Sequence, residues 1–402
     1  MPSTSHTPEI GKNHAKIHLY QIDFIRALTV LGVIMVHVIF FTNPPNSSDA
    51  GAVIMLLHYT REVFLFLTGF VLFYTYPSRP IAWPVFWRRR FRLIAIPYIL
   101  WTLIYAYIST YPGFGQALPF AHRVLIDLLQ GTAWYHLYYL LITMQIYLLF
   151  PAFQWLIDRT RRHHRLLFVL SLALELALML WYQADRAGGG LVGSFMPYRD
   201  MAFFSYQLYL LAGALAATHL PKLDEIVKLH RRAVMVAWTL SSVAVLSTYI
   251  LSREEFHVSP VIASMVFQPI MVPYCLATIL LLYSQGSLWA KNVRVGMGQR
   301  ALAGLSHHSF GLYLIHPLIL YAVLGDFDIP LTPYWPILHS ALVFSLTLSI
   351  SYLAVWLIAL TPISWYLMGR PGKSTLSFLR PLQWRYHLRL RTRPLSGSRG
   401  TE

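Results

Sequence analysis

Ten long apolar runs are the feature that most constrains how this chain can fold. A run of about 17 to 25 predominantly apolar residues is long enough to cross the hydrocarbon core of a bilayer as an α-helix. The loops between the runs are short, so the sequence leaves no room for a soluble domain of useful size. The runs cover residues 20–41, 52–76, 93–111, 134–153, 165–183, 202–219, 233–251, 260–284, 308–324 and 335–362.

The composition agrees with this pattern. Only 12% of the residues are charged and 56% are hydrophobic, whereas about 25% of the residues of a soluble domain are charged. We therefore predict an all-α, polytopic membrane protein of about ten transmembrane helices. Its single membrane domain would cover residues 19–368, after a cytoplasmic leader at 1–18 and before a basic tail at 369–402. The single cysteine, Cys275, excludes an intramolecular disulfide.

The distribution of positive charge predicts the orientation. Of the 32 lysines and arginines, 26 lie in the leader, the tail and every second loop, and only four lie in the other loops. Cytoplasmic loops of membrane proteins carry such an excess of positive charge. Both termini are thus expected in the cytoplasm. The net charge of +16 is mostly a topology signal and does not indicate a nucleic-acid partner; membrane lipids are the expected surroundings.

The first run, "IDFIRALTVLGVIMVH", carries ionisable residues at membrane depth. Arg26 and His37 are eleven residues apart, so on a helix they lie within about 20° of one face and about 16 Å apart along the axis. Asp23 is placed to pair with Arg26, which would make Arg26 a structural ion pair at the interface. His37 has no such local partner, and ionisable residues inside a membrane usually face a cavity and mark function.

Four other segments place unusual polar chemistry beside apolar runs. "HYTREVFLFLTGF" holds Glu62, with Thr68 and Gly69 allowing close helix contact. The remaining three are "FWRRRFRLIAIPY" with Arg89 and Arg92, "WYHLYYLLITMQIYLLFP" with Trp134, His136, Tyr139 and Tyr147, and "SFGLYLIHPLIL" with His316. The arginines have an alternative explanation, since positive charges commonly flank the cytoplasmic ends of membrane helices. The first aromatic residues could likewise belong to the aromatic belt at the membrane interface.

Motifs of soluble enzymes are missing from the sequence. There is no G-x-S-x-G, no H-E-x-x-H and no glycine-rich phosphate loop. His37, His136 and His316 could form a metal site by composition, but nothing in their spacing supports one, so no metal is expected.

Taken in order, these segments resemble the acyltransferase-3 family of bacterial membrane proteins over about residues 18–365. Arg26 and His37 match the family's Arg, ten residues, then His. Glu62 and Thr68 match an acidic segment that more often ends in Ser-Gly-Phe, and Arg89 and Arg92 match its Arg-x-x-Arg. The tryptophan and tyrosine segment after residue 133 and the Tyr-Leu-Ile-His segment at 313–316 are also similar.

The resemblance implies an enzyme of the bacterial cytoplasmic membrane that transfers an acyl group, commonly acetyl, from cytoplasmic acyl-coenzyme A to a hydroxyl of an extracytoplasmic or lipid-linked glycan. We expect the stand-alone type without a fused esterase-like domain. His37 would act as general base or acyl relay with Arg26 beside the thioester, and Arg89 and Arg92 would bind coenzyme A phosphates. The remaining candidates would contact the acceptor: Glu62, Trp134, His136, Tyr139, Tyr147 and His316.

A non-enzymatic role is the alternative. A polysaccharide exporter, or a membrane subunit of a glycan synthesis complex, would also need a cavity with basic residues. The titratable His37 lies on the same helix face as the cationic Arg26, and this pair favours the enzyme. An exporter needs a polar path but no such pair. Glycan-synthesis proteins or further copies of the chain are the expected protein partners. The sequence does not identify the acceptor.

Overall fold

The computed structural model describes residues 18–77, 81–110, 117–184, 196–291, 296–326 and 336–370, and within them the chain forms helices and no strand. Most of the predicted leader and tail lie outside the described residues. The longer helices are α1 (Tyr20–Thr42), α2 (Ser48–Leu57), α3 (Tyr59–Thr75), α4 (Trp83–Thr110), α5 (Ala117–Gln130), α6 (Tyr138–Arg159), α7 (His164–Ala184), α9 (Gln207–Thr218), α10 (Leu220–Leu229), α11 (Arg231–Glu254), α13 (Met271–Lys291), α14 (Met297–Asp326) and α15 (Pro336–Ala359). The short elements are η2 (Met196–Met201), η3 (Phe203–Tyr206), α12 (Pro260–Ala263) and α16 (Ser364–Met368).

Nine helical segments of the described chain are long and apolar enough to cross a membrane. The polytopic all-α fold predicted from the sequence is therefore confirmed. The remaining predicted span, which is the sixth along the chain at 202–219, is a shorter apolar helix, Phe203–Thr218. Its first residues form the 3₁₀ turn η3 instead of α-helix.

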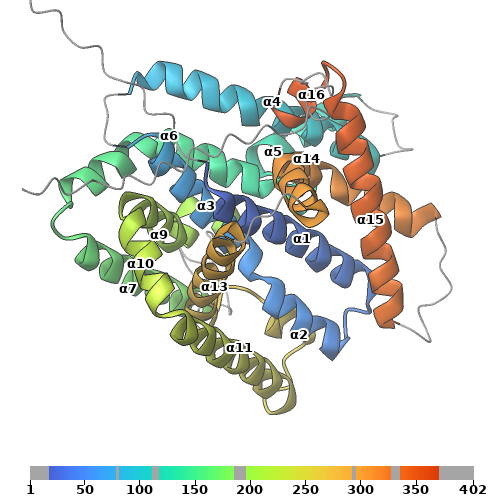
Figure 1. The fold of residues 1–402 in the computed structure, drawn as a ribbon. Coiled ribbons are helices and arrows are strands. Elements are labelled where there is room, and N and C mark those ends of the chain that lie inside the picture. The colour runs from blue at the N-terminus through green and yellow to red at the C-terminus, as the bar shows by residue number, and fades with distance from the viewer. Residues whose placement is uncertain are drawn as a thin grey trace, which may run out of the picture.

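Helix α1 lies near the centre of the bundle and contacts α2, α3, α13, α14 and α15 (Figure 1). Its apolar side chains explain this position, since Ile25, Ala27, Val30, Ile34 and Val38 are all fully buried. A helix that is apolar around most of its circumference is stable only inside a protein or a membrane. Arg26 and His37, which interrupt its apolar surface, are both partly buried.

The second predicted span, 52–76, is broken in the structure. Helix α2 ends at Leu57, and α3 begins at Tyr59, with His58 at the junction. The pair still measures 28 residues from Ser48 to Thr75 and counts as one apolar crossing. The break places Thr60, Arg61 and Glu62 in the first turn of α3, in the interior of the bundle.

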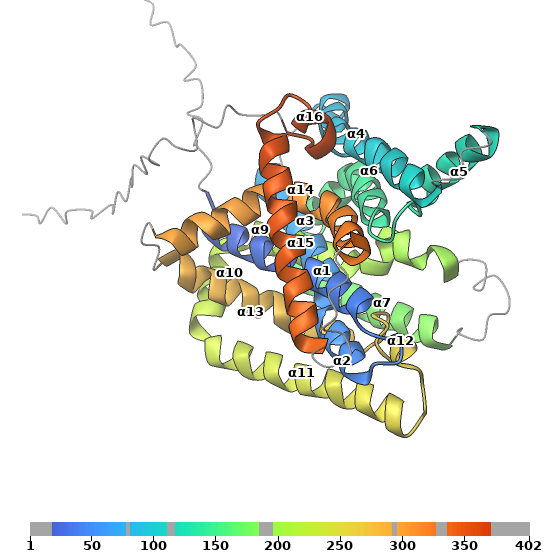
Figure 2. The ribbon, with the colours of Figure 1, turned by 90° about the vertical axis from the view of Figure 1, so that its right-hand side faces the viewer.

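Three further stretches of irregular chain lie between membrane helices: residues 131–137 before α6, residues 196–206 before α9 and residues 264–270 before α13. Backbone that is not helical is tolerated at membrane depth only where protein buries it or where it lines a cavity. Figure 2 shows α5 extending to one side of the bundle, while α11 runs along its edge. All three stretches contribute side chains to the cavity described in the next section.

Helices α3 and α9 pack directly against each other through glycine. A Cβ atom placed on Gly69 would lie 2.1 Å from the carbonyl oxygen of Leu210, and one on Gly213 would lie 2.0 Å from that of Phe66. Small residues let membrane helices approach closely. The close helix contact predicted at Gly69 is thus confirmed, with α9 as the partner.

We expect Gly213→Val to destabilise the protein by about 1–3 kcal/mol or more, because α3 and α9 would have to separate to accommodate the side chain. The unfolding temperature of the purified protein in detergent measures this effect. Gly298→Val is the matched control, since a Cβ at that glycine meets nothing within 4 Å. Equal unfolding temperatures for the two variants would contradict the close packing.

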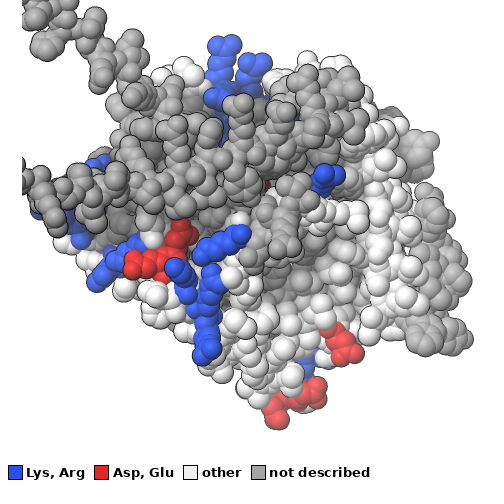
Figure 3. Space-filling model, in the orientation of Figure 1, with Lys and Arg blue, Asp and Glu red and all other residues white. Residues whose placement is uncertain are grey.

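The surface divides into charged and uncharged regions. In the view of Figure 3, lysines and arginines gather over α4 and α10, while the face formed by α15 is uncharged. Large apolar side chains such as Ile337, Leu353 and Leu357 are exposed on that helix. This apolar face fits contact with lipid tails.

Candidate active site

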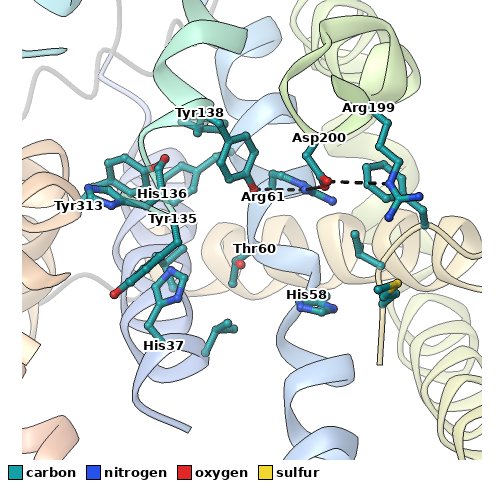
Figure 4. Close-up of a pocket in the computed structure, with 17 residues that line it drawn as sticks. His37, His58, Thr60, Arg61, Tyr135, His136, Tyr138, Arg199, Asp200 and Tyr313 are labelled. Carbon is teal, nitrogen blue, oxygen red and sulfur yellow. Dashed lines mark hydrogen bonds and ion pairs between the residues drawn. The ribbon is translucent and has the colours of Figure 1, made fainter. Parts of the chain in front are cut away.

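A polar cavity of about 300 Å³ opens in the interior of the bundle. It lies between α1, α3, the start of α6 and the irregular stretches before α9 and α13. Its polar wall contains three histidines, two arginines, an aspartate, a threonine and four tyrosines (Figure 4). These are His37, His58, Arg61, Tyr135, Tyr138, Tyr139, Asp200 and Tyr313, together with His136, Thr60 and Arg199.

His37 reaches the wall of this cavity from α1. Its imidazole lies against the ring of Tyr135, with the centroids 4.4 Å apart, and stacks on His316 at 5.4 Å. His37 also lines a second cavity of about 590 Å³, whose wall is mostly apolar. The two cavities share Val36, His37, His58, Tyr135 and Met265. His37 therefore stands at the junction of a polar and an apolar space.

Three histidines from distant parts of the chain form a contiguous cluster. The ring of His316 on α14 lies 5.7 Å from that of His136 and 5.4 Å from that of His37. The Nδ1 atom of His316 lies 3.0 Å from the carbonyl oxygen of Leu312, so Nδ1 carries the proton and Nε2 is left as the acceptor. Within the described residues no group of three histidine, cysteine or acidic side chains is arranged to hold a metal ion.

Arg61 organises the opposite wall of the polar cavity. Its guanidinium donates to Oε1 of Glu62 at 3.2 Å, to the hydroxyl of Tyr138 at 3.2 Å and to the carboxylate of Asp200 at 3.4 Å. It also lies over the ring of Tyr206, 4.4 Å from the centroid. Glu62 is 2% exposed, so its charge depends on this pair. Charged and aromatic groups of this kind suit recognition of a polyhydroxylated ligand.

A second group of predicted residues lies far from the cavity, at the end of the bundle that holds Arg26, Arg92 and Arg370. We call this the basic end. Arg26 pairs with Asp23 at 3.7 Å, which confirms the predicted local ion pair. Ser306 of α14 donates to Asp23 at 2.7 Å. Arg26 lines neither of the two cavities.

Asp23 also binds His18, which precedes α1. This hydrogen bond raises the pKa of the His18 imidazole, and the charge of the carboxylate adds to the effect, while partial burial opposes it. The start of α1 is thus held by a cluster of side chains from two helices. Arg26 has a structural partner here, although it also adds positive charge to the basic end.

The arginines at the start of α4 differ in their surroundings. Arg92 lies over the indole ring of Trp365 on α16, 5.1 Å from its centroid. Arg90 points inward and lies over the rings of Tyr76 and Tyr147 at 5.3 and 5.5 Å. Arg89 is exposed. Arg90 is therefore the arginine of this segment that reaches into the bundle, beside the predicted acceptor contact Tyr147.

The structure brings together only part of the predicted site. His37, His136 and Tyr139 line the polar cavity, and His316 lies directly behind His37. Trp134 stacks on Tyr105 at 4.8 Å, one layer behind the cavity. The remaining candidates line neither cavity: Arg26, Glu62, Arg89, Arg92 and Tyr147. Of these, Glu62 contacts the polar cavity's wall through Arg61.

Sequence reasoning missed several residues that line or support the cavity. Arg61 and Tyr138 stand out in the sequence as polar groups at membrane depth but were not among the predicted site residues. Arg199 falls in a predicted outer loop, and His58, Asp200 and Tyr313 were not singled out. The adjacent Arg61 and Glu62 in an apolar run carried a signal, because a charge pair in a membrane segment needs further partners. Arg90 also carried one, since it falls four residues after Phe86 and four before Ile94, on the buried stripe of α4.

A family model described as Acyl_transf_3, an acyltransferase domain, matches residues 19–372 of the chain. The match includes every helix of the bundle and both the polar cavity and the basic end. No curated protein and no solved structure shows detectable similarity to the chain.

Proposed function

Because this chain belongs to the Acyl_transf_3 family of acyltransferases, we propose that it transfers an acyl group from a coenzyme A thioester to a hydroxyl of an extracytoplasmic or lipid-linked glycan. Acetyl is the simplest such group. The family and the membrane helices are the starting point. The donor, the acceptor and the roles of individual residues are parts of the proposal.

One observation carries the proposal: His37 stands where the polar cavity meets the apolar one. A transferase of this kind needs a titratable group beside the acceptor hydroxyl and a separate space for the donor. The polar cavity offers Arg61, Asp200 and Tyr138 as hydrogen-bonding groups and tyrosine rings as stacking surfaces. Its volume of about 300 Å³ suits one sugar unit. His37 is the imidazole that reaches this space from α1.

In the proposed reaction, His37 accepts the proton of the acceptor hydroxyl as its oxygen attacks the thioester carbonyl. A new C–O bond forms, and the tetrahedral intermediate then breaks its C–S bond. The leaving thiolate takes the proton back from the imidazolium, which gives an ester and free coenzyme A. A relay through acyl-His37 is the alternative. The imidazole nitrogen would first attack the thioester, so that a C–N bond forms as the C–S bond breaks and the thiolate takes the imidazole proton. The acceptor hydroxyl would then attack the acyl-imidazole, so that the C–O bond forms, the C–N bond breaks and the hydroxyl proton returns to the imidazole.

The basic end supports binding of the anionic donor. Arg26, Arg92 and Arg370 lie there, and the positive-inside pattern of the sequence favours a cytoplasmic position for this end, on the side where coenzyme A thioesters occur. Guanidinium groups form paired, charge-assisted hydrogen bonds with phosphate. In this proposal, Arg92 and the exposed Arg89 bind the phosphates, and Arg90 lies further inside beside Tyr147.

We expect Arg92→Ala to raise the KM for acyl-coenzyme A about tenfold with little change in kcat, because one charge-assisted hydrogen bond contributes roughly 1.5–3 kcal/mol. Initial rates with varied donor concentration measure this split. Arg161→Ala is the control, since Arg161 is exposed and pairs locally with Asp158. If Arg92→Ala leaves the KM for the donor unchanged, this arginine does not bind the donor and only contributes to the orientation of the protein in the membrane.

The function itself is tested by comparing envelope glycans from cells with and without the gene. The proposal predicts that ester-linked acyl groups disappear while the amount of exported glycan stays the same. Exporter activity would give the reverse result, with acylation retained and glycan accumulating inside the cell.

A further inference from the structure

The larger cavity, of about 590 Å³, adjoins His37, and no part of the donor has yet been assigned to it. It extends from His37 along the last turn of α1, the following loop, α2 and the stretch around α12. Most of its wall is apolar, as in Val36, Ile39, Phe40, Ile54 and Val261. A cavity with such a wall favours an apolar ligand.

The polar side chains on the outer part of this wall form hydrogen bonds within the protein and not toward the cavity. Asn43 donates to the carbonyl oxygen of Ile39 at 3.0 Å and to the hydroxyl of Ser340 at 3.2 Å. Ser47 accepts from the backbone N–H of Ala50 at 3.2 Å, and Ser264 donates to the carbonyl oxygen of Val261 at 3.3 Å. Sugar hydroxyls would find few partners here.

The polar atoms that face a ligand gather at one end, where the cavity meets His37, His58 and Tyr135. The cavity thus fits an amphipathic group with its polar atoms at His37 and its hydrocarbon pointing away. A reacting thioester has this form. Its tetrahedral intermediate carries the acceptor oxygen, the coenzyme A sulfur, the former carbonyl oxygen and the alkyl chain on one carbon, and the alkyl chain needs an apolar space of its own.

We propose that the apolar cavity binds the hydrocarbon chain of the donor acyl group, and that this acyl group is longer than acetyl. The inference rests on the proposed function and adds the donor class to it. A methyl group needs about the space of one water molecule, roughly 30 Å³ of liquid volume. The cavity of about 590 Å³ has room for on the order of ten methylene groups, so acetyl would leave most of it unfilled.

Binding of unreactive donor analogues tests the inference without knowledge of the acceptor. The affinities of S-ethyl, S-butyl, S-hexyl and S-octyl coenzyme A are measured by the thermal shift of the purified full chain. In a fully apolar site, each buried methylene group increases the affinity by at most roughly fourfold. Affinity should therefore rise by about tenfold for every two carbons until the cavity is full.

Two variants on α2 provide the matched comparison. Ile54 lines the cavity, so Ile54→Trp should fill it and remove the gain beyond S-ethyl coenzyme A. The neighbouring Val53 is 41% exposed and does not line it, so Val53→Trp should keep the full series. This comparison also corrects for partition of the longer chains into detergent.

Equal affinities across the wild-type series would overturn the inference, and so would a series that Ile54→Trp leaves unchanged, because the hydrocarbon would then lie elsewhere. If Ile54→Trp fails to fold, the wild-type series decides, with Ile54→Ala expected to extend the preference to longer chains. If no analogue binds and coenzyme A itself does not bind, the proposed function fails. If all analogues bind with equal affinity, the proposed function stands, and only the assignment of the acyl hydrocarbon to the apolar cavity is wrong.

Discussion

Replacing His37 with alanine is expected to reduce acyl transfer by at least about 10²-fold, because the acceptor hydroxyl would lose the group that takes its proton. His37 is the imidazole that α1 contributes to the junction of the two cavities, which His58 also lines. The amount of folded protein in the membrane should stay near the wild-type level, since the variant leaves no charge unpaired. Ester formation per milligram of purified protein measures the effect.

His230→Ala is the control for the loss of a histidine. His230 is exposed at the end of α10 and should leave acyl transfer unchanged. His37→Gln separates proton transfer from packing, because glutamine retains hydrogen bonding but does not act as a base near neutral pH. Wild-type rates in both His37 variants would remove this residue from the mechanism.

Arg61→Met is expected to cause the largest loss of stability, about 3–5 kcal/mol. The substitution removes the partner of the buried Glu62 and of Asp200, and breaking a buried ion pair leaves an uncompensated charge. The side chain of Arg61 is 14% exposed and that of Glu62 is 3% exposed, so water screens the pair poorly. The unfolding temperature in detergent should fall sharply, and acyl transfer should fall with it.

A double-variant cycle tests the cause. Arg61→Met combined with Glu62→Gln should be more stable than Arg61→Met alone, because the second change removes the unpaired charge. Arg161→Met is the matched control for an exposed ion pair, where the cost should be below about 1 kcal/mol. If Arg61→Met and Arg161→Met had the same unfolding temperature, Arg61 would not be the centre of a buried network.

The sequence predicted the parts of the fold that depend on hydrophobicity and helical geometry. The apolar runs gave the membrane helices, and the spacing of three residues gave the pair of Asp23 and Arg26. The depth of His37 in an apolar run indicated that it faces a cavity, and the structure places it on the wall of two. These features are local, so one helix at a time was enough to find them.

The remaining site residues depend on contacts between distant segments. Asp200 reaches Arg61 across 139 positions, and its segment looked like an outer loop because hydropathy does not distinguish a loop in solvent from a stretch that lines a cavity. The break at His58 was not predicted, because the segment from Ser48 to Thr75 is apolar enough on average to count as one crossing despite the polar residues that follow His58. Arg90 is different, because its position on the buried stripe of α4 was readable from helical periodicity.

The most direct test of acyl transfer uses the purified full chain in proteoliposomes. Acyl-coenzyme A with a labelled acyl group is supplied, with a membrane glycan fraction from cells lacking the gene as acceptor. The account predicts one free coenzyme A thiol for each labelled ester formed by the wild type, and neither product above background for His37→Ala. Equal ester formation by the two proteins, or passage of glycan across the membrane without any ester, would contradict it.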